Sequence, residues 1–397
     1  MNTGTTIGAG GPAARTVRLG TRGSALAVAQ STQVARALAA ASRRIGADLE
    51  VKLVQIRTRG DVDATPLTRL GGVGVFAAAL REALLAGACD LAVHSCKDLP
   101  TAAVPGLRIA AVPAREDPRD ALCTADGRTL ADLPRGARVG TGSPRRGAQL
   151  LAVRPDLEVV PVRGNVPTRL SRVVGAVVGA DGPLGAVREP DLDAVVLALA
   201  GLRRLGLEGY ATQPLALPQT VIAGAGVVDP ADPAPVMVPA PAQGALALET
   251  RDEAGAGVHP DPSGVAAGVE PLVGGAGRDP GLAAALAATL AELDDPVTHA
   301  AVTAERALMR RLEAGCAAPV GAVAAPAPRA DGSSGLRLDA VVAAADGTRL
   351  LRESAVGDQA EPAGLGEAVA EALLSAGAAQ LVDLHAELPD RGRREAP

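Results

Sequence analysis

Residues 90–100, DLAVHSCKDLP, join an apolar run to a cluster of polar side chains and then reach a proline. Short apolar runs of this kind form the buried strands of α/β proteins, which bind ligands at the carboxyl ends of those strands. Pro100 disfavours helix at Leu99, so we expect an extended or turned path that holds Asp98 at the mouth of a cleft. A solvated pair of Lys97 and Asp98 on a surface turn is the alternative interpretation.

The chain has 397 residues, which is too long for one ordinary core and predicts two or three domains. Every apolar run is interrupted before it reaches membrane-spanning length. Residues 1–16 lack the pattern of a secretory signal, so we interpret them as a disordered tail and expect a cytoplasmic protein. A net charge of −5 and an aromatic content of 1% argue against a nucleic-acid partner.

Four cysteines are spread along the chain without a C-x-x-C pair: Cys89, Cys96, Cys123 and Cys316. We therefore expect neither a disulfide framework nor a metal site. Cys316 follows Gly315 on a predicted turn, where a thiol is exposed enough to react. A buried structural cysteine is the alternative there.

The first strand-to-helix junction runs from a strand over residues 17–21 into a helix over residues 25–41. Ser24 is the predicted N-cap, and Arg22 lies just outside the helix. A helix N-terminus beside an arginine suits a carboxylate or a phosphate, although ordinary capping explains the pattern equally well.

A second junction follows a predicted strand over residues 138–141. Ser143 is the expected cap, Pro144 suits the first helical position, and Arg145 and Arg146 then lie in the first turn. Arginines at that position oppose the helix dipole. Structure alone gives little reason for them, whereas a bound anion gives a good one.

A third junction follows a strand over residues 157–162, with Arg163 at its end and Arg169 one turn into the next helix. Three junctions that present arginines predict a ligand with several carboxylates. Solvated arginines in an arginine-rich protein are the alternative.

The rest of the chain is predicted by the same patterns. A glycine-rich stretch over residues 61–76 is interpreted as a mobile loop or lid, and residues 173–190 and 254–280 contain insertions of undetermined conformation. Further strands are expected at residues 49–56, 107–112, 192–199, 336–344 and 348–353, and helices at 76–86, 281–312 and 361–388.

Together these motifs resemble the porphobilinogen deaminase (hydroxymethylbilane synthase) family. The likeness covers the chain from about Val17 to the C-terminal helix. It rests on motifs in family order, including TRGSALAVAQ, AVHSCKDLP, REDPRDA, VGTGSPRRGAQL, VRGNVPTRL, LALAGLRRLGL, AQGALALE and VTAERALMRRLEAGCAAPVG.

The resemblance implies an α/β fold with two periplasmic-binding-protein-like domains flanking a cleft and a small C-terminal α+β domain. We place the first domain at residues 17–113 and 212–248, the second at 114–211 and the third at 249–397, with a low-complexity loop at about 254–280.

The activity implied is the head-to-tail condensation of four porphobilinogen molecules with loss of ammonia, followed by hydrolytic release of the linear tetrapyrrole. The product belongs to porphyrin biosynthesis, and the enzyme is expected to be a cytoplasmic monomer without nucleic-acid or membrane partners. By resemblance, Cys316 holds a dipyrromethane cofactor through a thioether, and Asp98 matches the catalytic aspartate.

Each pyrrole carries two carboxylates, which accounts for the basic junctions. By resemblance, the groups that bind the cofactor and substrate carboxylates are Arg22, Ser24, Lys97, Thr141, Ser143, Arg145, Arg146, Arg163 and Arg169. Arg69, Phe76 and Gln243 are implied at the lid and cleft. Three features depart from the family pattern: Val73 lacks a basic lid residue, Gly142 replaces a frequent serine, and AQG replaces the usual VGQG.

A non-catalytic protein that holds an acidic small molecule in a two-domain cleft is the alternative function, because similar folds serve both uses. Cys316 and Asp98 distinguish the two, since a passive binder needs no thioether anchor.

Overall fold

The computed structural model describes residues 6–7, 14–56, 75–174, 189–215, 237–252, 279–315 and 318–384. These residues form two compact units. Unit 1 holds the described residues up to Ala114 and those from Ala245 to His299, and unit 2 holds those from Arg115 to Gly244 and from Ala300 onward. Across the described part of the chain, every helix is too short or too polar to cross a membrane.

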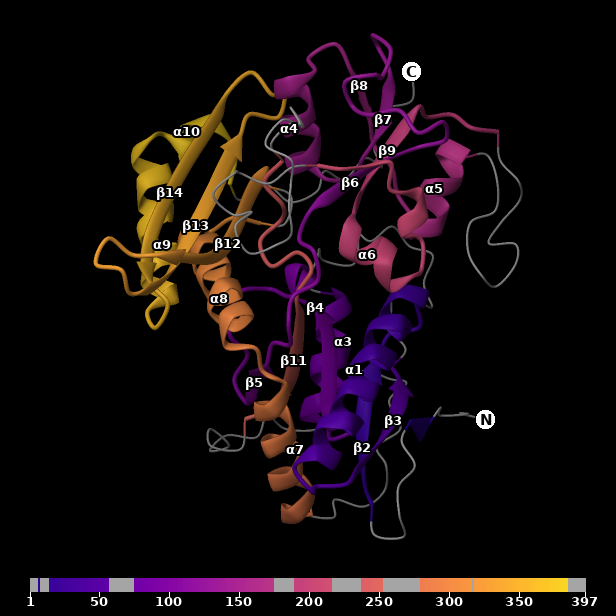
Figure 1. The fold of residues 1–397 in the computed structure, drawn as a ribbon, viewed down its shortest axis with the longest axis vertical. Helices are drawn as coiled ribbons and strands as arrows, with labels where there is room; N and C mark the ends of the chain where they lie inside the picture. Colours follow the sequence, from indigo (N-terminus) through magenta and orange to yellow (C-terminus); the bar gives the residue numbers. More distant parts are fainter. Residues whose placement is uncertain are drawn as a thin grey trace, which may run out of the picture. The chain divides into compact units, whose positions relative to one another are not determined.

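Unit 1 is built around a six-stranded mixed sheet (Figure 1). Its strands, in sheet order, are β1 (Thr6–Ile7), β3 (Leu49–Gln55), β2 (Arg15–Thr21), β4 (Leu91–Ser95), β11 (Leu246–Arg251) and β5 (Leu107–Ala111). β2 is parallel to β3 and β4, whereas β11 runs antiparallel to β4 and β5. We expected residues 1–16 to be a disordered tail; instead β1 pairs with β3, and β2 begins at Arg15.

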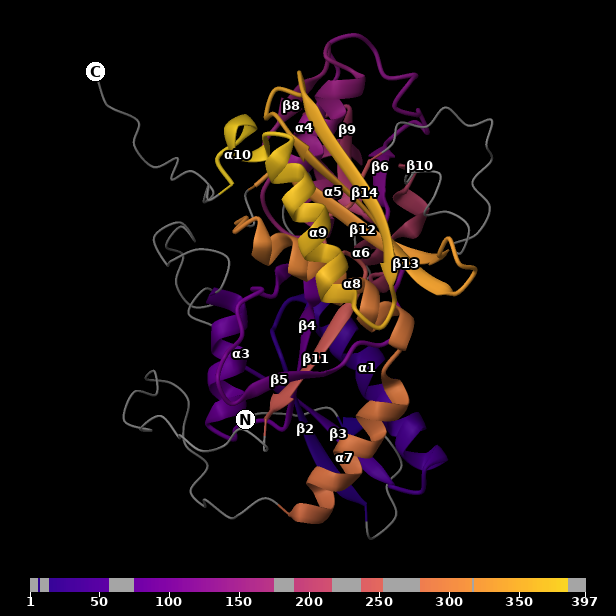
Figure 2. The same ribbon diagram turned by 90° about the vertical axis from the view of Figure 1, so that its left-hand side faces the viewer.

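Three helices cover the two faces of this sheet (Figure 2): α1 (Ala25–Arg44), α7 (Pro280–Leu293) and α3 (Val75–Leu85). Leu91 and Val93 of β4 pack in the same core cluster as residues of α1 and α7. Ala92, between them, packs in the cluster of α3. Because successive side chains of a strand point to opposite faces, β4 is buried on both sides.

Unit 2 contains a second mixed sheet. Its strands, in sheet order, are β10 (Gln213–Pro214), β6 (Asp120–Thr124), β9 (Ala194–Ala198), β7 (Arg138–Gly140) and β8 (Glu158–Val160). β7 is parallel to β8 and β9, whereas β6 runs antiparallel to β9 and β10. One face packs against α5 (Val166–Val174) and α6 (Leu199–Arg204), and the other packs against α4 (Pro144–Val153).

The two sheets share one strand order. In the first sheet, β2 lies between β3 and β4, and in the second, β7 lies between β8 and β9. An antiparallel strand follows on the outer side of β4 and of β9: β11 separates β4 from β5, and β6 separates β9 from β10. Each antiparallel strand begins soon after the chain passes into its unit, at Ala245 or Arg115. This repeat agrees with the predicted pair of α/β domains. Within residues 212–248, which we assigned to the first domain, β10 lies in the second sheet and β11 begins the return to the first.

A third, antiparallel sheet in unit 2 contains β12 (Val320–Pro328), β13 (Ser334–Ala343) and β14 (Leu350–Asp358). It packs with α8 (Pro296–Arg311), α9 (Pro362–Ser375) and α10 (Ala378–Leu381) in one core cluster. The hairpin of β13 and β14 and the helix after it were expected, and the small C-terminal α+β domain is confirmed.

Two local features differ from the sequence-based expectation. β12 was not predicted, because its VGAVAAPAP sequence has no polar alternation and its first five residues are all buried. The helical region expected over residues 281–312 consists of two helices, α7 and α8, and the break between them was not predicted. The break falls where Asp295 accepts a hydrogen bond from the Thr298 backbone N–H (2.7 Å) and Pro296 begins α8.

Glu305 of α8 joins three segments of unit 2. Its carboxylate is fully buried and accepts hydrogen bonds from both terminal nitrogens of Arg115 (2.6 and 3.0 Å). It also accepts the backbone N–H groups of Ala242 and of Ala324 in β12, the latter at 2.7 Å. One carboxylate therefore fixes the start of unit 2, the segment before β11 and the third sheet.

We predict that Glu305→Ala lowers the free energy of unfolding by about 3–5 kcal/mol, because it leaves the buried Arg115 charge and two backbone donors without their acceptor. Urea denaturation followed by circular dichroism measures the change. Glu371→Ala is the matched control: Glu371 pairs with Arg311 on the surface, and its loss should cost less than about 1 kcal/mol. Equal effects of the two substitutions would contradict the assigned role of Glu305.

Candidate functional site

The polar cluster after β4 forms a short 3₁₀ turn, η2 (Cys96–Asp98). The Cys96 backbone N–H donates to the Ala245 carbonyl (3.0 Å), which ties the turn to the start of β11. Leu99 is extended, with φ −89° and ψ 120°, as Pro100 led us to expect. Cys96 is buried, Lys97 is half-buried and Asp98 is exposed. The turn thus presents a carboxylate to solvent at the carboxyl end of a buried strand.

A buried group of three charged or polar side chains supports this strand from the α3 side. The Glu249 carboxylate of β11 accepts hydrogen bonds from Arg81 Nε (3.0 Å) and Nη2 (2.9 Å) and lies 3.1 Å from His94 Nε2. Burial alone would raise the pKa of Glu249, but the nearby His94 and the hydrogen bonds from Arg81 outweigh it and hold the pKa below its usual value. Sequence reasoning did not single out Arg81 or Glu249. The one signal in the sequence was Glu249 itself, a single acid within the otherwise apolar run ALALET.

At the first junction, Ser24 is the N-cap of α1, as predicted. Its Oγ accepts a hydrogen bond from the Ala27 backbone N–H (3.3 Å). Arg22, between β2 and this cap, is half-buried. The junction in unit 1 therefore combines ordinary capping with a nearby cation.

At the second junction, α4 begins at Pro144 with Ser143 as its N-cap. The Ser143 side chain makes no capping bond, and its backbone N–H donates to Thr141 Oγ1 (3.2 Å). Arg145 and Arg146 are only 3% and 6% exposed. They lie in the first turn as predicted, but they are buried within unit 2.

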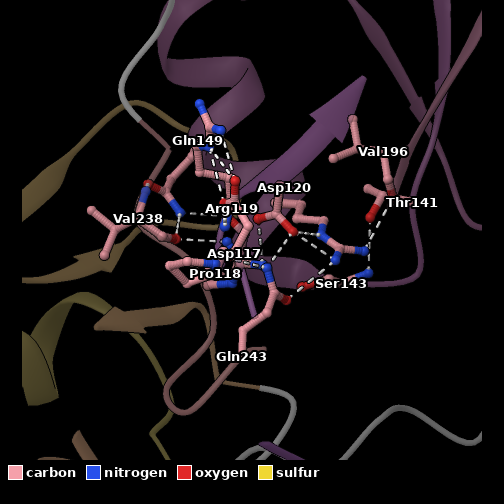
Figure 3. A network of polar contacts seen from close by, with 12 residues as sticks. Asp117, Pro118, Arg119, Asp120, Thr141, Ser143, Gln149, Val196, Val238 and Gln243 are labelled. Atoms are coloured by element: carbon pink, nitrogen blue, oxygen red, sulfur yellow. Dashed lines mark hydrogen bonds and ion pairs between the residues drawn. The ribbon is translucent and has the colours of Figure 1, made fainter. Parts of the chain in front are cut away.

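The structure supplies a reason for these arginines that sequence reasoning did not find. Asp120, the first residue of β6, is completely buried and accepts a hydrogen bond from Arg146 Nε (2.9 Å). Arg146 Nη2 and Arg145 Nη2 lie 2.7 and 2.8 Å from its two oxygens. The prediction that structure gives little reason for the pair is therefore wrong, because both arginines pair with the buried Asp120 carboxylate. Figure 3 shows Asp120 in the polar network that it shares with Gln243.

Gln243 completes the surroundings of Asp120. Its Nε2 donates to Asp120 Oδ1 and to the Pro118 carbonyl, both at 2.8 Å. Burial alone would raise the pKa of Asp120, but Arg145 and Arg146, together with the hydrogen bonds, lower it well below its usual value. Asp120 is therefore ionised at neutral pH.

The segment before β11 holds Arg145 from the other side. Arg145 Nη1 donates to the Val238 carbonyl (2.6 Å), and Gln149 of α4 bonds both the N–H and the carbonyl of Val238 (2.8 and 3.0 Å). The Val238 side chain packs with Val323 and Val341 of the third sheet. Val238 thus links α4, the helix that carries Arg145, to the third sheet.

The third junction in unit 2 is more open. Arg163 is exposed, and Arg169 is half-buried with its Nε donating to the Gly164 carbonyl (2.8 Å). Arg204 of α6 was not singled out from the sequence. It is half-buried and donates to the Gly244 carbonyl (2.7 Å), and burial lowers its pKa.

Gly142 occupies a position that has no room for a side chain. A Cβ there would lie 2.6 Å from the Val162 carbonyl oxygen. The departure from the family's frequent serine therefore coincides with a close approach of two backbone segments.

Several predicted site residues lie outside the described residues. These are Cys316 and the lid positions Arg69 and Val73; Phe76 is described only as backbone, in α3. Of the other predicted residues, Arg22, Ser24, Lys97 and Asp98 lie in unit 1, and Thr141, Ser143, Arg145, Arg146, Arg163, Arg169 and Gln243 lie in unit 2.

A pair of α/β domains of matching topology, with arginines at strand-to-helix junctions, is the architecture of a class of proteins suited to anionic ligands. Comparison with known proteins narrows this class. Residues 17–256 match the family model "Porphobilinogen deaminase, dipyromethane cofactor binding domain", and residues 299–375 match "Porphobilinogen deaminase, C-terminal domain".

Curated relatives are similar in sequence to this chain over most of its length. The porphobilinogen deaminase of Micrococcus luteus is 53% identical over 341 residues, covering 85% of this chain and 81% of the relative. That of Cutibacterium acnes is 48% identical over 379 residues, covering 93% and 98%. The chain belongs to the porphobilinogen deaminase family.

Three cysteines lie among the described residues, Cys89, Cys96 and Cys123, and all three are buried. Cys89 and Cys123 are 0% and 2% exposed, and burial raises the pKa of both thiols to about 12. At pH 8 the thiolate, which is the reactive form, is then about one part in ten thousand of each thiol.

We predict that iodoacetamide leaves Cys89 and Cys123 unmodified in the native protein and labels both after unfolding in urea. Peptide mass spectrometry reads out each site, and rapid labelling of either in the native protein would contradict the structure.

Proposed function

We propose that this chain is a hydroxymethylbilane synthase, a transferase that condenses four porphobilinogen molecules and releases the linear tetrapyrrole. Membership of the family supports the activity. The observation that carries the proposal at the level of the site is the buried arginine pair of α4, in which two guanidinium groups face the single carboxylate of Asp120. A surplus positive charge in a buried place is suited to an anionic ligand.

The residues present fit the family's dipyrromethane cofactor. Its carboxylates need cationic donors, and among the described residues the buried Arg145 Nε has no hydrogen-bond partner. Arg145, Arg146 and the more exposed Arg163 and Arg169 would hold those carboxylates, and Cys316 would form the thioether. When bound, the cofactor supplies the primer to which substrate units are joined.

Asp98 is the group we assign to proton transfer. It is exposed on a turn whose backbone is fixed to the start of β11 through Cys96. The position of the Asp98 backbone is therefore defined, and its carboxylate is accessible to a ligand. There it would donate a proton to the amino group that leaves as ammonia and then, as a carboxylate, offset the positive charge that develops on the carbon to which that group was bound. Lys97 beside it and Arg22 and Ser24 at the α1 junction would bind carboxylates of the same ligand.

Further parts of this proposal concern the whole protein. Porphobilinogen is its proposed substrate, and Arg69, Phe76 and Gln243 are proposed at the lid and cleft. We propose a cytoplasmic monomer that binds neither nucleic acid nor membrane. For the domains, we keep residues 17–113 in the first and 114–211 in the second. β10 assigns residues 212–215 to the second domain, because this strand lies in the second sheet. β11 and α7 assign residues 246–251 and 280–293 to the first domain, since β11 lies in its sheet and α7 packs in its core, so the third domain begins at about Ala300 instead of residue 249.

We predict that the parent chain converts porphobilinogen to hydroxymethylbilane and that Asp98→Asn lowers turnover by about 10²–10⁴-fold, the usual contribution of a positioned acid or base. The asparagine keeps the size of the side chain and removes its proton transfer. Product formation is measured at saturating porphobilinogen, and circular dichroism checks the fold.

Asp126→Asn serves as the control, because Asp126 is an exposed carboxylate paired with Arg128. Its turnover should match the parent. Near-parent turnover by Asp98→Asn would refute the role of Asp98, and absence of turnover in the parent would refute the proposed function.

A further inference from the structure

Two turns of the third sheet share one sequence pattern. Residues 330–333 read ADGS and lie between β12 and β13, whereas residues 345–348 read ADGT and lie between β13 and β14. In each turn the glycine has a positive φ, 80° at Gly332 and 73° at Gly347, and its N–H donates to the carbonyl three residues earlier (both 2.9 Å). Glycine adopts this hairpin conformation without strain.

An aspartate stabilises both turns in the same way. Asp331 accepts hydrogen bonds from the backbone N–H and the hydroxyl of Ser333 (3.0 and 2.6 Å). Asp346 accepts the corresponding bonds from Thr348 (3.0 and 2.7 Å). The two turns therefore have the same local structure, and only their surroundings distinguish them.

The surroundings differ at the glycine. A Cβ at Gly332 would meet no atom of the described residues within 4 Å. A Cβ at Gly347 would lie 2.5 Å from the Ala152 backbone nitrogen and 2.7 Å from the Ala148 carbonyl oxygen, both in α4. The turn between β13 and β14 thus packs against the backbone of α4 (Figure 1), where only glycine fits.

This contact falls on the face of α4 that carries Arg145. Ala148 and Ala152 follow Arg145 by three and seven residues, so the three lie on one side of the helix. Gln149, four residues after Arg145, lies on the same side and holds Val238. Leu150 points away from it and packs in the core of the second sheet. The helix is therefore enclosed between the second and third sheets.

A contact with the helix backbone constrains the position of α4 strongly. A side chain in contact can change its rotamer, whereas the backbone yields only when the helix moves, because packed interiors transmit strain. Ala148 is one helical turn from Arg145, so a displacement at Ala148 moves the first turn of α4 with it.

We propose that the turn of residues 345–348 is a positioning element that acts through α4. Gly347 sets how closely the helix approaches the third sheet, and this distance places both Arg145 and Arg146 for the carboxylates of the ligand. The inference rests on the proposed function and assigns the turn itself no contact with the ligand. Because β12, the strand that follows Cys316 in the sequence, belongs to the same sheet, this sheet also relates the arginines to the chain after the attachment residue.

Gly347→Ala tests the proposal, with Gly332→Ala as its matched control. Both place alanine at a positive φ, so Gly332→Ala should lower Tm by about 2–6 °C and Gly347→Ala by at least as much. Only Gly347→Ala also displaces α4. We expect it to raise the KM for porphobilinogen about 5–30-fold and to leave kcat within about threefold of the parent, because misplaced arginines weaken substrate and transition-state binding alike. Gly332→Ala should keep the parent KM.

A merely structural role would give a different result. Loss of folded enzyme lowers the apparent kcat but leaves KM unchanged, since the remaining folded molecules bind as the parent does. The full chain of each variant is first incubated with porphobilinogen, and kcat is normalised to the fraction that intact mass spectrometry shows to carry two linked pyrrole units. Kinetics are measured well below the lowest Tm of the set.

A second pair of variants decides the question if Gly347→Ala does not fold or does not gain the pyrrole units. Asp346→Ala and Asp331→Ala each remove the same two hydrogen bonds from a turn and introduce no clash. Asp346→Ala loosens the turn that contacts α4 and should raise KM about 2–5-fold. Asp331→Ala should not change KM.

A parent-like KM in folded Gly347→Ala would overturn the positioning role, as would a parent-like KM in Asp346→Ala where Gly347→Ala cannot be measured. An equal rise of KM in a variant and its control would overturn it too, because the twin turn does not contact α4. A parent chain that forms no hydroxymethylbilane would instead refute the proposed function. The two failures are distinguishable, since the second is seen before any substitution is made.

Discussion

The ion pairing of Asp120 with Arg145 and Arg146 is the constraint on which the rest of unit 2 depends. Removing one carboxylate and two guanidinium groups from water is tolerated only when each has close partners. Those partners come from β6, β9, the first turn of α4 and the segment before β11. The same contacts that stabilise the second sheet therefore fix the positions of the arginines that the proposed chemistry needs.

The third sheet is connected to this arrangement through the short segment before β11. Val238 is held by α4 through Gln149 and packs against Val323 and Val341, while the Ala242 backbone N–H donates to Glu305. Cys316 lies four residues before β12 in the sequence. β12, which follows the proposed attachment residue in the sequence, therefore lies in the same unit as the proposed carboxylate site.

Local patterns in the sequence predicted much of the fold. Apolar periodicity located β2, α1 and β4, Ser24 capped α1 as expected, and Pro100 kept Leu99 extended. The uniform small residues of β12 carry no periodic signal, so that strand was missed. The partners of the arginines were also missed, because the contact between Asp120 and Arg146 depends on the order of strands in a sheet and not on spacing in the sequence. Family motifs identified Arg145 and Arg146, but only the folded chain shows what balances them.

The most direct test of the account is the intact mass of the purified protein beside a Cys316→Ala variant. The account predicts that the parent carries an increment equal to two linked pyrrole units, bound through a thioether, and that the variant has the mass of the bare chain. Bare-chain masses for both proteins, unchanged after incubation with porphobilinogen, would contradict it and would favour a protein that binds an acidic small molecule without transforming it.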